Sequence, residues 1–192
     1  MPAAARTRDA AATRAAILNS AIHNFARAGY DGVGVREIAG DAGVTAMLVN
    51  RYFGSKEQLF AEVVESSFAP PELITDHPND IAKDAAAALV ARSAQDADEL
   101  SPFLIMLRSA SNPRACEIVR DAIERHVGTR LAGQLPEPGR HLRSDVLLSV
   151  ISGVLLMRRV VGVRALNRPA AAGQLLQLLE AVFDAILDTP LA

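Results

Sequence analysis

Cysteine is nearly missing from this 192-residue chain, which has only Cys116. One cysteine cannot close an internal disulfide, which excludes a disulfide-stabilised secreted scaffold. Residues 1–16 also lack the order of basic, apolar and small residues that is typical of an export signal. The longest charge-free apolar run identified in the C-terminal half, Val146 to Met157, is shorter than the roughly 20 residues of a membrane-spanning helix. We therefore expect a cytoplasmic protein without a membrane anchor.

Residues that bind metals or carry out catalysis are also sparse. The chain has four histidines, His23, His77, His126 and His141. They lie far apart in the sequence, and none has metal-ligand spacing relative to Cys116. Glu117, Glu124 and His126 share one predicted helix, but no second helix offers the matching set that a diiron bundle needs. We expect neither an enzyme nor a bound metal or cofactor.

The net charge is small, but its sign differs between the two parts of the chain. In total, 20 basic and 22 acidic residues give a formal charge of −2. Residues 1–60 carry seven basic and five acidic side chains, which is +2, and the remainder carries 13 and 17, which is −4. A basic N-terminal part agrees with a nucleic-acid partner, although a solvated charged face gives the same count.

Glycine and proline divide the chain into segments in which apolar residues recur at helical spacing. This pattern predicts an all-α fold of about nine helices. Four are expected near residues 12–28, 35–42, 45–53 and 55–67, and five more near 80–97, 102–110, 113–134, 139–165 and 169–188. Pro70, Pro71 and Pro78 indicate a boundary. The predicted parts are a flexible arm at 1–11, a head at 12–68 and a C-terminal domain at 78–192.

The segment from Val35 to Phe53 has the features of a helix-turn-helix. Such a motif needs a small residue where its two helices cross and a tight turn between them, and Ala39 and Gly43 meet these needs. Val49 and Phe53, four residues apart, can anchor the inner face of the second helix. Its outer face would then be free to enter the major groove of DNA.

The chemistry of the outward positions suits contacts with DNA. Asn50 can bond adenine and Arg51 can bond guanine, each through two hydrogen bonds. Lys56 begins the next helix, which Ser55 and Gln58 open as a capping box, and a helix start favours an anion such as a phosphate. A plain surface charge explains Lys56 as well. The predicted DNA-binding residues are Arg36, Thr45, Ala46, Met47, Asn50, Arg51, Tyr52 and Lys56.

Residues 12–65 contain a series of short motifs. They include Thr13-Arg14, Phe25-Ala26, Gly29-Tyr30, Val35-Arg36-Glu37-Ile38-Ala39, Ala42-Gly43-Val44-Thr45, Tyr52-Phe53 and Ser55-Lys56-Glu57-Gln58-Leu59. In its order and spacing, and without a gap or insertion, this series resembles the N-terminal signature of the tetracycline-repressor (TetR) family. The resemblance implies a homodimeric transcriptional repressor that binds a near-palindromic operator in double-stranded DNA.

Two positions depart from the family pattern. Asn50 stands where the family usually has tyrosine, and Gly34 stands where it usually has a serine or threonine that caps the second helix. Asn50 could read a base or merely bond a neighbouring side chain. A helical interaction module that has lost DNA binding is the rival interpretation of the whole head.

The helices predicted near 140–165 and 169–188 are apolar over more of their surface than one core contact needs. The resemblance implies that they pair with their copies in a dimer; the alternative is that they form the centre of a monomer's core. The resemblance also implies an unidentified small-molecule effector. Candidate residues for its pocket are Phe103, Met106, Leu107, Cys116, Val119, Ile123 and His126, although plain packing explains each of them too.

Overall fold

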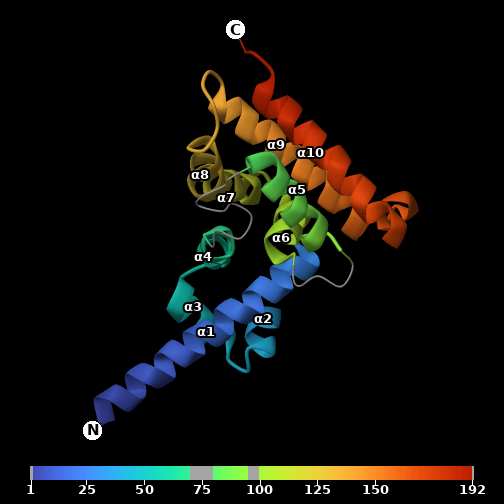
Figure 1. Ribbon diagram of the computed structural model, residues 1–192. Coiled ribbons are helices and arrows are strands. Elements are labelled where there is room, and N and C mark those ends of the chain that lie inside the picture. Colours follow the sequence, from blue (N-terminus) through green and yellow to red (C-terminus); the bar gives the residue numbers. More distant parts are fainter. Residues whose placement is uncertain (1, 70–79, 95–99, 192) are drawn as a thin grey trace. The chain divides into compact units, whose positions relative to one another are not determined.

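The computed structural model describes residues 2–69, 80–94 and 100–191, and every regular element in these ranges is helical (Figure 1). The predicted all-α fold is therefore confirmed. Contacts divide the chain into two compact units. We call Met1–Pro70 with Leu100–Ile123 the head unit, and Pro71–Glu99 with Glu124–Ala192 the C-terminal unit.

The head unit contains six α-helices. They are α1 (Pro2–Ala28), α2 (Val35–Asp41), α3 (Ala46–Phe53), α4 (Lys56–Phe68), α6 (Ser101–Ser109) and α7 (Pro113–Ala122). Helix α1 begins at Pro2, ten residues before the expected start near Ala12. The added residues include five alanines, which have the highest intrinsic helix propensity.

The core of the head unit forms where α1 and α4 meet. Ile17, Ala21 and Phe25 recur every four residues on one face of α1, and all three are buried. Phe60 of α4 meets the edge of the Phe25 ring with 5.0 Å between the ring centroids, an arrangement that favours aromatic pairs. This contact fixes α4 against α1, and the motif helices α2 and α3 pack around the same core.

Helices α6 and α7 pack against α1 and α4 and so belong to the head unit. The predicted boundary between the two domains lies before α6 and α7, because it follows from three prolines of the sequence. Prolines indicate where a helix ends, but they do not indicate which helices a later helix packs against. The predicted limits of 12–68 and 78–192 stay a prediction. Pro70, Pro71 and Pro78, on which the boundary rests, lie outside the described residues.

The C-terminal unit is built on three longer helices. They are α5 (Ile81–Arg92), α9 (Arg140–Leu155) and α10 (Ala172–Asp188). Helix α10 packs against both α5 and α9, which lies beside it in Figure 1. The shorter elements are the π-helical turns Ile123–Gly128 and Leu156–Val160, the helix α8 (Thr129–Ala132), and the 3-10 turns Arg164–Asn167 and Pro169–Ala171. The run predicted over 113–134 is thus α7, a π-helical turn and α8 in succession.

Two buried arginines bond the C-terminal ends of neighbouring helices in this unit. Arg143 donates to the carbonyl oxygens of Ile186 and Thr189 at the end of α10, the latter at 2.7 Å. Arg158 donates to the Val90 carbonyl at 3.1 Å and to the Ser93 hydroxyl at the end of α5. Burial, and then the neighbouring Arg159, lowers the pKa of Arg158. These bonds satisfy carbonyls that the helix itself leaves unpaired.

Among the described residues, the stretch Pro169–Asp188, predicted as a helix from its apolar periodicity, is long and apolar enough to cross a membrane. Its most apolar 18 residues have a mean hydropathy of 1.4, and 17% of that window is buried. Length and composition alone do not distinguish such a segment from a helix that packs on another protein surface. The stretch also carries Glu180 and Asp184.

Candidate nucleic-acid interface

Helices α2 and α3 form the helix-turn-helix that the sequence predicts. Gly43, with φ +68°, reverses the chain between them, and the Val44 amide donates to the Ala39 carbonyl at 2.9 Å. Thr45 caps α3, since its hydroxyl oxygen accepts from the Leu48 amide at 3.3 Å. Gly34 precedes α2 and offers no side-chain cap. Helix α2 begins at Val35 and helix α3 at Ala46, each within one residue of its predicted start.

Helix α3 presents one anchored face and one open face. Val49 and Phe53 are buried in the head core, with exposures of 1% and 6%. Met47, Asn50 and Arg51 are exposed, and Met47 at 80% is the most exposed large apolar residue described. Of the other predicted contact residues on or beside α3, Thr45 is exposed, whereas Ala46 and Tyr52 are half-buried and pack against the core.

The start of α4 lies next in the chain and is capped as predicted. The Ser55 hydroxyl oxygen accepts from the Gln58 amide at 3.1 Å. The ammonium of Lys56 lies 4.5 Å from the centroid of the Tyr30 ring, a cation–π contact that holds this charge beside the helix start. Burial, and then the charges of Glu57 and Asp31, raises the pKa of Tyr30. Lys56 thus has both a helix start and an aromatic ring to fix its position.

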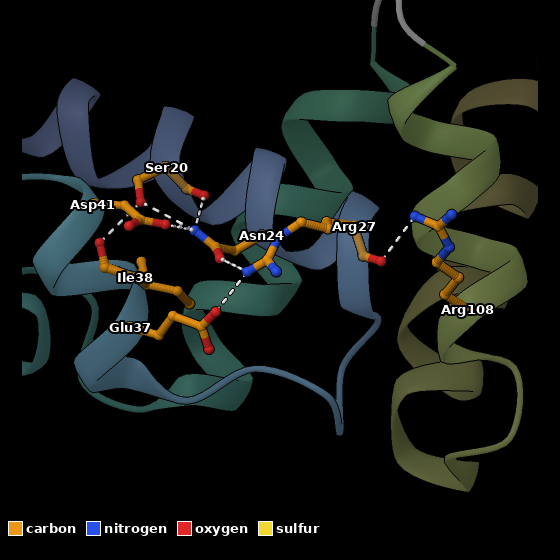
Figure 2. Close-up of polar contacts among 7 residues, drawn as sticks. All are labelled: Ser20, Asn24, Arg27, Glu37, Ile38, Asp41 and Arg108. Atoms are coloured by element: carbon orange, nitrogen blue, oxygen red, sulfur yellow. Dashed lines mark hydrogen bonds and ion pairs between the residues drawn. The ribbon is translucent and has the colours of Figure 1, made fainter.

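A buried amide fixes α2 against α1, and sequence reasoning missed it. Asn24 is 2% exposed, and its side-chain nitrogen donates to the Ser20 carbonyl at 3.0 Å and to the Asp41 carboxylate at 2.7 Å (Figure 2). The Ser20 hydroxyl donates to the Ile38 carbonyl at 2.8 Å. The signal in the sequence is that Asn24 falls among the apolar residues of the buried stripe of α1. A polar side chain there must find a partner.

The same network continues to the end of α1. Arg27 donates to the Asn24 amide oxygen at 2.9 Å and to the Glu37 carboxylate at 2.5 Å. Arg108 of α6 donates to the Ala26 carbonyl. It also donates to the Arg27 carbonyl at 2.8 Å, the bond that Figure 2 shows. The motif helix α2 is therefore bonded to α1, and α1 in turn to α6.

The charges of the head unit favour an anion near α3. Its acidic side chains are largely engaged inside the unit: Asp31, Glu37, Asp41, Glu57 and Glu62 each accept a hydrogen bond from an arginine or asparagine. Within the described residues, Arg36 and Arg51 make no ion pair and are exposed. A DNA phosphate or base would meet these two guanidinium groups without a competing carboxylate.

Comparison with known families agrees with this geometry. Residues 17–63 match the family described as bacterial regulatory proteins, tetR family. Residues 80–187, more than half of the chain, match the tetracyclin repressor-like C-terminal domain. The chain belongs to the TetR family. The family resemblance predicted from the head residues is confirmed, and it extends to the C-terminal part.

Individual proteins are similar to parts of the chain or to its fold. An HTH-type transcriptional repressor of Streptomyces coelicolor is 41% identical over 58 residues, which is 30% of each chain. The HTH-type transcriptional regulator BetI of Agrobacterium fabrum is 35% identical over 80 residues, 42% of this chain and 34% of BetI. The alignments thus span about a third of the length of these relatives. Salmonella enterica GusR shares the fold, with a TM-score of 0.70 at 15% identity over 92% of this chain and 96% of GusR.

The residues predicted to line an effector pocket differ in their burial and in what they pack against. Val119 is part of the head core, and Met106 and Ile123 pack against it. Phe103 is buried, and Leu107, Cys116 and His126 are half-buried. Packing therefore accounts for three of the seven, and the pocket stays a prediction. Among the described residues, no group of three histidine, cysteine or acidic side chains could hold a metal ion.

Proposed function

We propose that the chain is a cytoplasmic, homodimeric repressor of transcription that reads operator DNA with the outer face of α3. One observation carries the proposal: Asn50 and Arg51 are exposed on a helix whose opposite face, Val49 and Phe53, is locked into the head core. Both exposed side chains can bond base edges in the major groove. The Streptomyces coelicolor relative, which matches over 30% of its own length, is named a repressor.

Three of the remaining predicted residues, Thr45, Lys56 and Arg36, fit contacts with the DNA backbone. The Thr45 hydroxyl accepts from the Leu48 amide and keeps its own hydrogen for a phosphate oxygen. Lys56 stands at the start of α4, where helix amides and the helix dipole favour an anion. Arg36 on α2 is exposed and has no ion pair within the described residues. Such contacts position a protein on DNA, whereas base contacts give it specificity.

We propose that α9 and α10 form the dimer interface. Leu142 and Val146 on α9, and Leu178 and Val182 on α10, are exposed large apolar residues. An apolar surface of this extent is rare on a monomer and is covered when two copies pair. A twofold dimer would place two α3 helices in successive major grooves, about 34 to 36 Å apart, on a near-palindromic site.

Release from DNA is proposed to follow binding of an unidentified small molecule, as the family resemblance implies. Helices α6 and α7 carry Phe103, Leu107 and Cys116 and pack directly on α1 and α4 of the head unit. A ligand that binds better to one arrangement of these helices would shift the population of heads that can bind the operator.

The first test is selection of bound fragments from a randomised duplex pool with the purified full-length protein. We expect one enriched near-palindromic site, with an affinity that falls steeply as salt rises. Arg51→Ala should weaken binding, whereas Arg120→Ala, which removes another exposed arginine, from α7, should leave it unchanged. If no duplex is enriched, DNA binding is overturned and a helical interaction module is favoured.

A further inference from the structure

The most exposed large apolar side chain of the head unit lies on the surface proposed to meet DNA. Met47 is 80% exposed, while its neighbours Ala46 and Tyr52 pack against the head core. The side chain is thus not needed for the core. Exposing this apolar side chain to water is unfavourable, so a partner surface that covers it would bind more favourably.

Phosphate contact cannot account for this residue, because a thioether has no hydrogen to donate to a phosphate oxygen. Met47 is three residues before Asn50 and four before Arg51, so these exposed side chains share one face of α3. Any base edge that Asn50 or Arg51 reaches therefore lies close to Met47.

The major groove offers one apolar group to such a side chain, the C5 methyl of thymine. Methionine is unbranched and polarisable and adapts to small apolar targets. We propose that Met47 is a specificity-determining residue that packs against a thymine methyl in each half of the operator. The proposal rests on the proposed DNA-binding function and adds to it one base that the site must contain.

The test uses the operator obtained by selection and replaces its thymines by deoxyuridine, one symmetric pair at a time. Deoxyuridine keeps every hydrogen-bonding group of thymine and lacks only the methyl. Burial of one methyl predicts about a fourfold loss of affinity per half-site, and about 15-fold when both are replaced. Fluorescence anisotropy at fixed salt measures each affinity.

Three variants assign the effect to Met47. Met47→Ala should bind the thymine and deoxyuridine operators with equal affinity at that position, because no side chain remains to contact the methyl. Met47→Leu should keep most of the discrimination, because it remains apolar. Asn50→Ala should also keep it while losing affinity elsewhere in the site. Because Met47 is exposed, its replacement leaves the head core intact.

The outcomes separate this inference from the function on which it rests. If the operator binds tightly and deoxyuridine is tolerated at every position, the inference is overturned and the DNA-binding function stands. The inference is also overturned if Met47→Ala discriminates as strongly as the unaltered chain does. If selection enriches no duplex at all, both the function and the inference are overturned.

Discussion

Eight large apolar side chains are exposed in the described residues, and seven of them lie in the C-terminal unit, whereas the head unit has only Met47. The head unit buries its aromatic residues Phe25 and Phe60 completely. The C-terminal unit leaves Leu178 at 66% exposure on a helix whose other face is buried. The head unit therefore has a closed core, while the C-terminal unit leaves an apolar face exposed.

Among the described residues, the two units also differ in the burial of their arginines, since only the C-terminal unit has buried ones. In the head unit, exposed arginines pair with carboxylates: Arg14 with Glu62, and Arg27 with Glu37. In the C-terminal unit, the buried Arg143 and Arg158 bond carbonyls at helix ends. Exposed ion pairs contribute about 0 to 1 kcal/mol each, whereas hydrogen bonds from buried charged groups contribute about 1.5 to 3 kcal/mol. The arginine bonds of the C-terminal unit are thus expected to contribute more than the exposed ion pairs of the head unit.

The largest expected effect comes from charging the open apolar face. Leu178→Glu with Val182→Glu places two carboxylates four residues apart on exposed positions of α10. Covering them in a dimer would bury unpaired charge, so we expect the dimer to dissociate. Loss of the second head should lower operator affinity by about 100-fold or more. Sedimentation velocity and anisotropy would measure the two effects.

A matched variant on the same unit controls for added charge alone. Ala87→Glu with Ala91→Glu makes the same change at two exposed positions of α5. We expect it to remain dimeric and to bind the operator normally. If the α10 variant also stayed dimeric, the interface would lie elsewhere. The exposed apolar face of α10 would then not be the surface that a second copy covers.

Within the closed head unit, Gly29 at the end of α1 lies against the backbone of a neighbouring helix. Its φ is +72°, and an added Cβ would lie 2.2 Å from the Arg108 carbonyl oxygen. Gly29→Ala combines left-handed strain with a steric overlap and should lower the free energy of unfolding by roughly 3 kcal/mol. Gly43→Ala, at φ +68° with no atom nearby, should cost only about 1 kcal/mol. Urea unfolding at one protein concentration compares them; equal losses would show that the contact with α6 is not tight.

The parts of this fold that were predicted from sequence are those with local causes. The starts of α3 and α4 follow from Thr45 and Ser55, each of which accepts a bond from an amide three residues ahead. The anchored and open faces of α3 follow from helical periodicity, which correctly placed Val49 and Phe53 inside. The exposure of Met47, Asn50 and Arg51 follows from the same periodicity, although their contacts with DNA stay predictions.

The parts that sequence reasoning did not provide depend on which helices pack together. Nothing local in Arg108 indicates that it bonds the end of α1, 81 residues earlier, because that contact exists only once α6 packs on α1. The grouping of α7 with α4 has the same cause. Asn24 gave a usable signal by its place in an apolar stripe, but its partner Asp41 is known only from the fold.

Arg143 and Arg108 both bond carbonyls at a helix end, but only Arg143 is buried. Arg143→Ala removes a buried guanidinium from the carbonyls of Ile186 and Thr189 and should lower the free energy of unfolding by about 2 to 3 kcal/mol. Arg108→Ala removes a similar pair of bonds from an exposed arginine, where water replaces them, and should cost about 1 kcal/mol. Equal costs in urea unfolding would contradict the view that burial distinguishes the two units.

The smallest expected effect concerns the uncapped start of α2. Gly34 has φ −104° and ψ 155°, a conformation open to any residue, and an added Cβ would meet no atom within 4 Å. Gly34→Ser should therefore raise the free energy of unfolding by about 0.5 to 1 kcal/mol, through a new cap and a less flexible unfolded chain. Gly34→Ala shares only the second effect, so the difference between serine and alanine in urea unfolding isolates the cap. If alanine stabilises as much as serine, the start of α2 gains nothing from a cap, and the bonds from Ser20 and Asn24 to α2 already hold it in place.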